Sequence, residues 1–183
     1  SARLVQLGLE GTDDRVHADK SVTPTFLFAV MLWPAILREL GTPDGPLPED
    51  PQRLLDASDK VIGRQLQRIA LPKRFSLPMR ELIMLQTRFE RRSGRRALRL
   101  LEHPRFRAAY DFLLLRADAG EVDRELADWW TDLQDASETD RLAMVENRPP
   151  SEQAAASKTA SPDGSKRRRR PRQLAILPAQ KAA

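Results

Sequence analysis

Arginine is the residue type best placed to do chemistry in this sequence, and arginines crowd the stretch from Arg91 to Arg116. The stretch reads RRSGRRALRLLEHPRFRAAYDFLLLR and contains eight arginines but only two acids, together with many leucine, alanine and aromatic residues. A guanidinium group donates hydrogen bonds to phosphate oxygens in a planar fork and remains charged at any working pH. The stretch therefore indicates a basic face for a polyanion, carried by a segment that is apolar enough to belong to a core.

The positive charge of the chain is concentrated in one block. Residues 64–107 carry 13 basic and 3 acidic side chains, whereas residues 1–63 have a net charge of −4 and residues 108–183 of −1. Pairing within the block cannot neutralise it, because only Glu81, Glu90 and Glu102 are available there. Such clustering is typical of proteins that bind an anionic partner, usually nucleic acid. The alternative is a solvated helix surface that happens to use arginine.

The spacing within the block suggests how the charge is presented. If the region is one helix, four arginines at i, i+4, i+7 and i+11 share a face, flanked by Arg91 and Arg96. The four are Arg88, Arg92, Arg95 and Arg99. Gly94 could break this helix, in which case its backbone could approach a phosphate closely. Phe75, Phe89 and Phe106 are expected in the core, which favours reading of a nucleic-acid backbone over reading of bases.

Catalytic patterns are absent from the sequence. There is no cysteine, no glycine-rich nucleotide loop and no D-x-D pair for two-metal chemistry. The nearest carboxylate pair, Glu121 and Asp123, falls at an expected helix start, where acids stabilise the helix dipole. Of the two histidines, His103 is expected to cap or pack a helix, and His17 has no ligand-like neighbours. We therefore expect no catalytic residues, no metal site and no activity from this chain alone.

Helical spacing recurs along the chain, and no segment alternates apolar and polar residues for long. The pattern predicts an all-α fold of about five to six helices. The first is expected to begin with Thr23 as N-cap and Pro24 at its first position, and to stop at Gly41. The last is expected to bury one residue of the Trp129–Trp130 pair. The expected helices lie near residues 23–40, 51–70, 76–92, 94–103, 104–116 and 121–134.

Composition divides the chain into three parts. Residues 1–20 are interpreted as a segment continuing from an upstream domain, residues 21–145 as a helical body, and residues 146–183 as a disordered tail rich in Pro, Ser, Ala and charge. The tail carries a second basic run, Arg167, Arg168, Arg169 and Arg170. The apolar run from Phe26 to Leu37 is too short to span a bilayer. With no cysteine and no signal-peptide layout, a cytoplasmic location is expected.

Four segments carry a family resemblance. FLFAVMLWP, IALPKRF, RRSGRRALRLLEHPRFRAAYDFLLLRA and WWTDLQ occur in this order within roughly residues 10–135. Together they resemble the C-terminal half of bacterial poly(A) polymerase, a member of the tRNA nucleotidyltransferase superfamily. The resemblance implies adenylate addition to RNA 3′ ends, using ATP and Mg²⁺, in mRNA processing and decay. It also implies that the catalytic carboxylates lie upstream of Ser1, so that this chain itself binds neither cofactor.

The resemblance also suggests which residues hold the RNA. The basic positions that match the family pattern are Lys73, Arg74, Arg91, Arg92, Arg95, Arg96, Arg99, Arg105 and Arg107. Arg88 joins them by helical spacing, and the basic run of the tail by composition. RNA is the expected partner, with RNA-decay proteins as a further class. Two alternatives stay open: a CCA-adding tRNA nucleotidyltransferase, and a helical protein-interaction module that docks a partner through Trp129 and Trp130.

Overall fold

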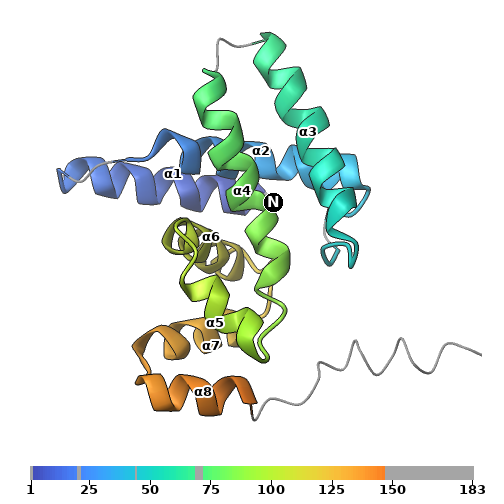
Figure 1. Ribbon diagram of the computed structural model, residues 1–183. Coiled ribbons are helices and arrows are strands. Elements are labelled where there is room, and N and C mark those ends of the chain that lie inside the picture. The colour runs from blue at the N-terminus through green and yellow to red at the C-terminus, as the bar shows by residue number, and fades with distance from the viewer. Residues whose placement is uncertain (1, 20–21, 44, 69–71, 147–183) are drawn as a thin grey trace, which may run out of the picture. The chain divides into compact units, whose positions relative to one another are not determined.

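The computed structural model describes residues 2–19, 22–43, 45–68 and 72–146, and within these ranges the chain is all-α (Figure 1). The expected fold class is confirmed. Eight α-helices and two short 3₁₀ helices are formed in these ranges, and no strand. They are α1 (Ala2–His17), α2 (Pro24–Leu40), α3 (Pro51–Arg68), η1 (Lys73–Phe75), α4 (Ser76–Leu85), η2 (Gln86–Arg88), α5 (Arg95–Leu101), α6 (Phe106–Asp118), α7 (Arg124–Asp135) and α8 (Glu138–Glu146).

Two helices, α1 and α8, exceed the expected number. In α1 only Leu4 and Gly8 are buried, and in α8 only Val145 is buried. A buried stripe this sparse leaves little apolar periodicity in the sequence, because most of each helix surface faces solvent. The expected tail lies outside the described residues, apart from Glu146 at the end of α8. None of the described helices is long and apolar enough to cross a membrane.

Helix α2 lies at the centre of the first of two hydrophobic clusters, and its ends are set as the sequence predicted. Thr23 has extended backbone angles, Pro24 is the first helical residue, and Gly41 closes the helix with a φ of 75°. The Gly41 N–H donates to the carbonyl of Arg38, and the next N–H donates to that of Leu37. A left-handed residue at this position satisfies the last carbonyls of a helix, and glycine adopts it without steric cost.

The first cluster joins α1, α2, α3 and α4. Its largest side chain is Trp33, which is fully buried and meets Phe112 of α6 edge to face at 5.3 Å between ring centroids. Leu54, Val61 and Ile62 add the buried face of α3. Because the α2 face is apolar over most of its length, it can contact α1, α3, α4 and α6 at once.

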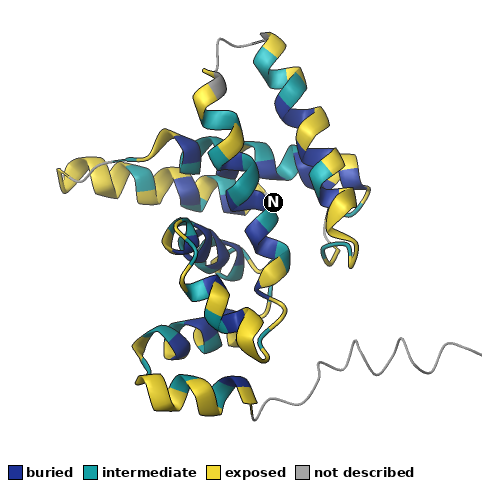
Figure 2. Ribbon diagram, in the orientation of Figure 1, coloured by how far each residue is buried: buried dark blue, intermediate teal, exposed yellow. Residues whose placement is uncertain are grey.

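The second cluster joins α5, α6, α7 and α8 to the end of α4 (Figure 2). Trp130 is fully buried in it, whereas Trp129 is only partly buried, so one member of the pair is enclosed as expected. Helices α4 and α6 supply side chains to both clusters, since Phe112 belongs to the first and its neighbour Leu113 to the second. These two helices therefore connect the clusters.

A buried polar network lies where the clusters meet, and Arg116 of α6 is its centre. The Arg116 side chain is 6% exposed, and its guanidinium lies 5.0 Å from the centroid of the Trp33 ring and 3.6 Å from the Glu121 carboxylate. Trp33 Nε1 donates to the same carboxylate at 2.8 Å. On the other side Arg116 donates to Gln86 Oε1 at 3.3 Å, and Gln86 Nε2 donates to the Ala109 carbonyl at 3.0 Å.

Burial lowers the pKa of the Arg116 guanidinium to about 10, while the carboxylates of Glu121 and Glu90 oppose this shift. The group therefore stays charged near neutral pH. A buried charge is tolerated only when it is paired and hydrogen-bonded. Glu121, in the turn after α6, provides the counter-charge, and Gln86 accepts the hydrogen bond. In that turn Gly120 has a φ of 77°, and the Glu121 N–H donates to the Arg116 carbonyl. The turn brings Glu121 back over the guanidinium.

We predict that Glu121→Gln lowers the free energy of unfolding by about 3 kcal/mol, because it leaves a buried cation without its counter-charge. The double variant Arg116→Met with Glu121→Gln is expected to lose less than the single variant, since it removes the charge as well. Urea unfolding of the wild type, of Glu121→Gln, of Arg116→Met and of the double variant measures the coupling energy between the two side chains. Additive effects of the two substitutions would contradict it.

Two glycines of α1 provide a second prediction. A Cβ added at Gly8 would lie 2.6 Å from Val30 Cγ1, whereas one added at Gly11 would meet nothing within 4 Å. Val30 is fully buried and its branched side chain has little rotamer freedom. Gly8→Ala is therefore expected to lower the free energy of unfolding by about 1–3 kcal/mol, and Gly11→Ala to raise it by about 0.5–1 kcal/mol. If the two substitutions shift the melting temperature in the same direction, close packing of α1 on α2 at Gly8 does not determine the difference.

Candidate nucleic-acid interface

The basic block does not form one helix, so the expectation that Arg88, Arg92, Arg95 and Arg99 share a helical face is wrong. Helix α4 ends at Leu85, η2 ends at Arg88, and a non-helical segment of residues 89–94 leads into α5. The physical reason is the burial of Phe89. Its ring meets Trp130 edge to face at 5.1 Å, and its carbonyl accepts a hydrogen bond from Trp130 Nε1 at 2.9 Å. These contacts hold Phe89 in the second cluster, and the non-helical backbone of Gly94 then separates residues 89–93 from α5.

Gly94 breaks the helix, as the sequence allowed, but its amide is not free for a phosphate. Gly94 has a φ of 65° and a ψ of −166°, a region that essentially only glycine adopts. Its N–H donates to the Val145 carbonyl of α8 at 3.0 Å. The glycine therefore turns the chain into α5 and connects this turn to α8.

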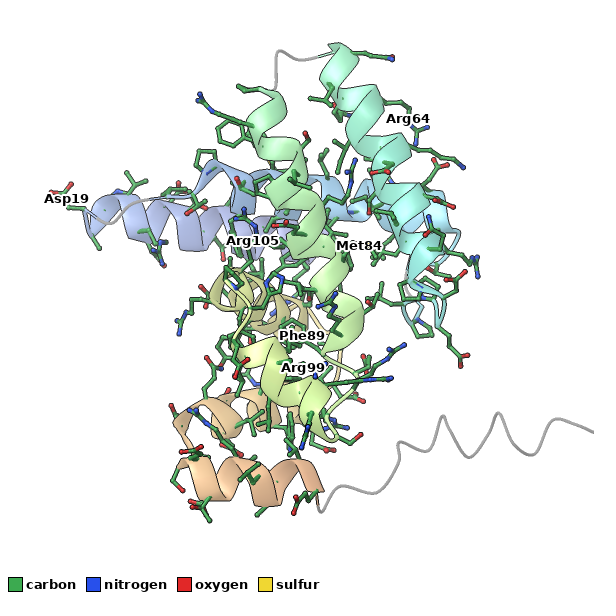
Figure 3. The ribbon with its side chains drawn as sticks, in the orientation of Figure 1. Asp19, Arg64, Met84, Phe89, Arg99 and Arg105 are labelled. Carbon is green, nitrogen blue, oxygen red and sulfur yellow. The ribbon has the colours of Figure 1, made fainter. Side chains whose placement is uncertain are left out.

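Six arginines of the block are exposed and form no ion pair with any residue that the structure describes. One of them, Arg74, lies on η1. The other five lie on η2, on the segment that follows it and on α5: Arg88, Arg91, Arg95, Arg96 and Arg99. We call these five residues the arginine corner; one of them, Arg99, is labelled in Figure 3. The buried residues between them, Phe89, Ala97 and Leu100, pack into the second cluster. The corner is thus a charged surface fixed to a core by its intervening apolar residues.

Three other arginines predicted to hold RNA have acidic partners in the fold, and their role in RNA binding stays a prediction. Arg92 Nη1 lies 3.1 Å from Glu125 Oε1 of α7. The remaining pairs join Arg105 to Glu81 of α4 and Arg107 to Asp111 one turn along α6. The pairings with Glu81 and Glu125 could not be assigned from the sequence, because these acids lie 24 and 33 residues away from their partners and no local spacing reports such contacts.

The other predicted positions lie away from the corner or outside the described residues. Arg74 is exposed, with its guanidinium 4.9 Å from the centroid of the Phe75 ring. Lys73 begins η1, but its side chain is outside the described part of the structure. The basic run from Arg167 to Arg170 is also outside it. A role for these residues in RNA binding stays a prediction.

None of the ten aromatic residues of the chain is exposed, although all ten lie in described ranges. Phe89 and Phe106 are buried, and Phe75 packs partly buried against the first cluster. The expectation that these three rings belong to the core is confirmed. Without exposed rings on which bases could stack, the corner offers charge and hydrogen bonds but no stacking platform.

His103 and Glu121, the histidine and the carboxylate that the sequence singled out near expected helix starts, both make contacts within the fold. His103 Nδ1 accepts the backbone N–H of Arg105 at 3.1 Å, which confirms its expected capping role. Glu121 is engaged by Trp33 and Arg116 rather than standing free at a helix start. In the ranges that the structure describes, no three His, Cys, Asp or Glu side chains group so that they could hold a metal ion. These residues do not fit a Mg²⁺ site.

Residues 49–174, which include the whole arginine corner, match a family model described as the polymerase A arginine-rich C-terminus. The chain belongs to this family. Over 149 residues it is 38% identical to poly(A) polymerase I of Escherichia coli O6:H1 and 36% identical to that of Salmonella typhi. It is 30% identical to poly(A) polymerase I of Haemophilus influenzae. The resemblance found in the sequence is thereby confirmed.

The matched segment covers 78% of this chain in the first two comparisons and 80% in the third. The chain spans about a third of the length of these curated relatives, between 31% and 33%. Most of the arginines that the structure describes within the matched residues are exposed, including the five of the corner, whereas Arg116 is buried.

The backbone at Gly94 provides a test of how this surface is held. We predict that Gly94→Ala lowers the free energy of unfolding by about 1–3 kcal/mol, because a Cβ is strained at this φ and ψ. Gly63 of α3 is a matched control, since it has no positive φ and a Cβ there meets nothing within 4 Å. Gly63→Ala is expected to be neutral or stabilising. Chemical denaturation measures the free energy of unfolding of both variants. Equal values would show that the backbone at Gly94 is not strained by a Cβ.

Proposed function

We propose that the arginine corner binds the phosphate backbone of RNA, and that it serves an enzyme that adds adenylates to RNA 3′ ends. The observation that carries the proposal is the set of five exposed arginines that have no acidic partner among the described residues and lie between side chains packed into the second cluster. Membership of the arginine-rich family supports the enzyme class, as do relatives whose names are poly(A) polymerase I. Arginine suits phosphate because its fork of donors matches two phosphate oxygens.

The chemistry of the corner favours binding that tolerates many sequences. Phosphate contacts position an RNA without reading its bases, and the absence of exposed rings leaves no stacking contact on the described surface. Neutralisation of phosphates releases counterions, so affinity falls with salt. ATP and Mg²⁺ would be used by the catalytic part of the full-length enzyme, with this chain contributing RNA binding. Such a role would place the protein in the cytoplasm.

The alternatives are less well supported. A CCA-adding tRNA nucleotidyltransferase is disfavoured because the similar proteins are named poly(A) polymerase I. Docking of a protein through both tryptophans is disfavoured because Trp130 is fully buried. A surface for an RNA-decay protein could instead use the exposed acids of α7 and α8, such as Asp128 and Glu138. RNA binding remains the function that the exposed arginines of the basic block support.

The salt dependence of RNA binding is the first test of this proposal. With about five phosphate contacts on single-stranded RNA, log K is expected to fall against log[salt] with a slope of roughly −3.5. Fluorescence anisotropy of labelled oligo(A) at several salt concentrations measures it. A heteropolymeric RNA of equal length should give a similar slope. Absence of binding at low salt, or binding that is independent of salt, would refute the proposal.

A charge-matched pair of variants locates the binding surface. Arg95→Ala with Arg96→Ala removes two cations from the corner, and the slope should then be about −2. The control, Arg38→Ala with Arg53→Ala, removes two exposed cations from α2 and α3. We expect roughly ten-fold weaker binding for the corner variant and little change for the control. Equal losses would mean that overall charge, and not the corner, determines binding.

A further inference from the structure

Three contacts from α7 and α8 converge on the short segment that carries the arginine corner. Trp130 Nε1 donates to the Phe89 carbonyl at 2.9 Å, and Gly94 N–H donates to the Val145 carbonyl at 3.0 Å. Between these two points, Arg92 pairs with Glu125 at 3.1 Å. The segment is non-helical, so these contacts from other helices replace the regular hydrogen bonds that a helix would supply.

We propose that Glu125 is a positioning residue for RNA binding, acting through Arg92 to hold residues 90–93 in the shape that presents the arginine corner. This inference rests on the proposed function and adds to it. It gives Arg92 a different role from its neighbours: its side chain points to α7 and supports the RNA surface, whereas Arg91 and Arg95 face solvent.

The exposure of the two partners supports this division. The Arg92 side chain is only 17% exposed, whereas the five arginines of the corner are exposed. Glu125 is 75% exposed and lies in the first turn of α7. Its carboxylate therefore contributes little to the core. Within this segment the Arg91 N–H donates to the Arg88 carbonyl, and the Arg92–Glu125 pair adds a restraint between the contacts at Phe89 and Gly94.

The direction in which RNA affinity changes when Glu125 is neutralised shows whether Glu125 positions the segment or only repels phosphate. A carboxylate near an RNA-binding surface repels phosphate, so its neutralisation alone would strengthen binding. If Glu125 positions the segment, Glu125→Gln weakens binding instead, because the segment must then be ordered when RNA binds. From the usual strength of exposed ion pairs, we expect about two- to five-fold weaker binding.

The experiment uses the full 183-residue chain and labelled oligo(A), with thermal unfolding to establish that every variant is folded. Asp132→Asn is the matched control: Asp132 is an exposed acid two helical turns further along α7, with no side-chain partner in the described residues. The control is expected to bind as tightly as the wild type or slightly more tightly. Glu125→Gln is expected to bind more weakly.

A double-mutant cycle tests whether Glu125 acts through Arg92. Arg92→Gln should weaken binding about as much as Glu125→Gln, and the double variant should lose no more than either single variant. The salt slope should remain unchanged in Arg92→Gln, because a residue that does not touch phosphate releases no counterion. A further loss in the double variant, or a shallower slope, would make Arg92 an RNA contact and overturn the inference.

The failure of this inference differs from the failure of the proposed function. If Glu125→Gln binds as tightly as the wild type while Arg95→Ala with Arg96→Ala binds weakly, the corner binds RNA but Glu125 does not position it. If the corner variant also binds like the wild type, RNA binding by the corner is itself refuted. Tighter binding by Glu125→Gln would identify Glu125 as a repulsive neighbour only.

Discussion

The buried charge of Arg116 is the constraint on which the body of this protein depends. Its guanidinium lies between the two hydrophobic clusters, with Trp33 and Glu121 on one side and Gln86 on the other. Taking this cation out of water is costly, and the cost is offset only when all these partners are in place together. Helices α2, α4 and α6 and the turn after α6 must therefore adopt compatible positions, which links the support of the arginine corner to the rest of the body.

Whether an arginine has a carboxylate partner in the fold affects how available its charge is to a phosphate. Arg92, Arg105 and Arg107 have carboxylate partners in the fold, whereas the five residues of the corner have none among the described residues. Charge that is already paired in the protein is less available to a phosphate, because the pair would have to be broken first. A block that looks uniform in sequence is thus divided into arginines that stabilise the fold and arginines that remain available to an anion.

Much of the fold followed from local rules. The limits of α2 were predicted by Thr23, Pro24 and Gly41, because capping and proline effects act within one turn. The core positions of α6 and α7 followed from helical periodicity: Phe106 and Tyr110 are buried as expected, and Trp130 is the enclosed member of the tryptophan pair. Helices α1 and α8 were not predicted, because each buries too few residues to produce a periodic signal. The helix expected across residues 88–92 was wrong, because burial of Phe89 against Trp130 overrides local helical spacing.

The sequence by itself determined the all-α class, the position of the basic block and its excess of cations over acids, since these depend on composition and on spacing within a few turns. It also carried the motifs of the arginine-rich family. Only the tertiary structure decided which arginines are free and that Arg116 is a buried structural charge. It also placed Glu125 beside Arg92. The reason is physical: an ion pair depends on distance in space, and residues 33 positions apart in the chain come within 3.1 Å only when the helices have packed.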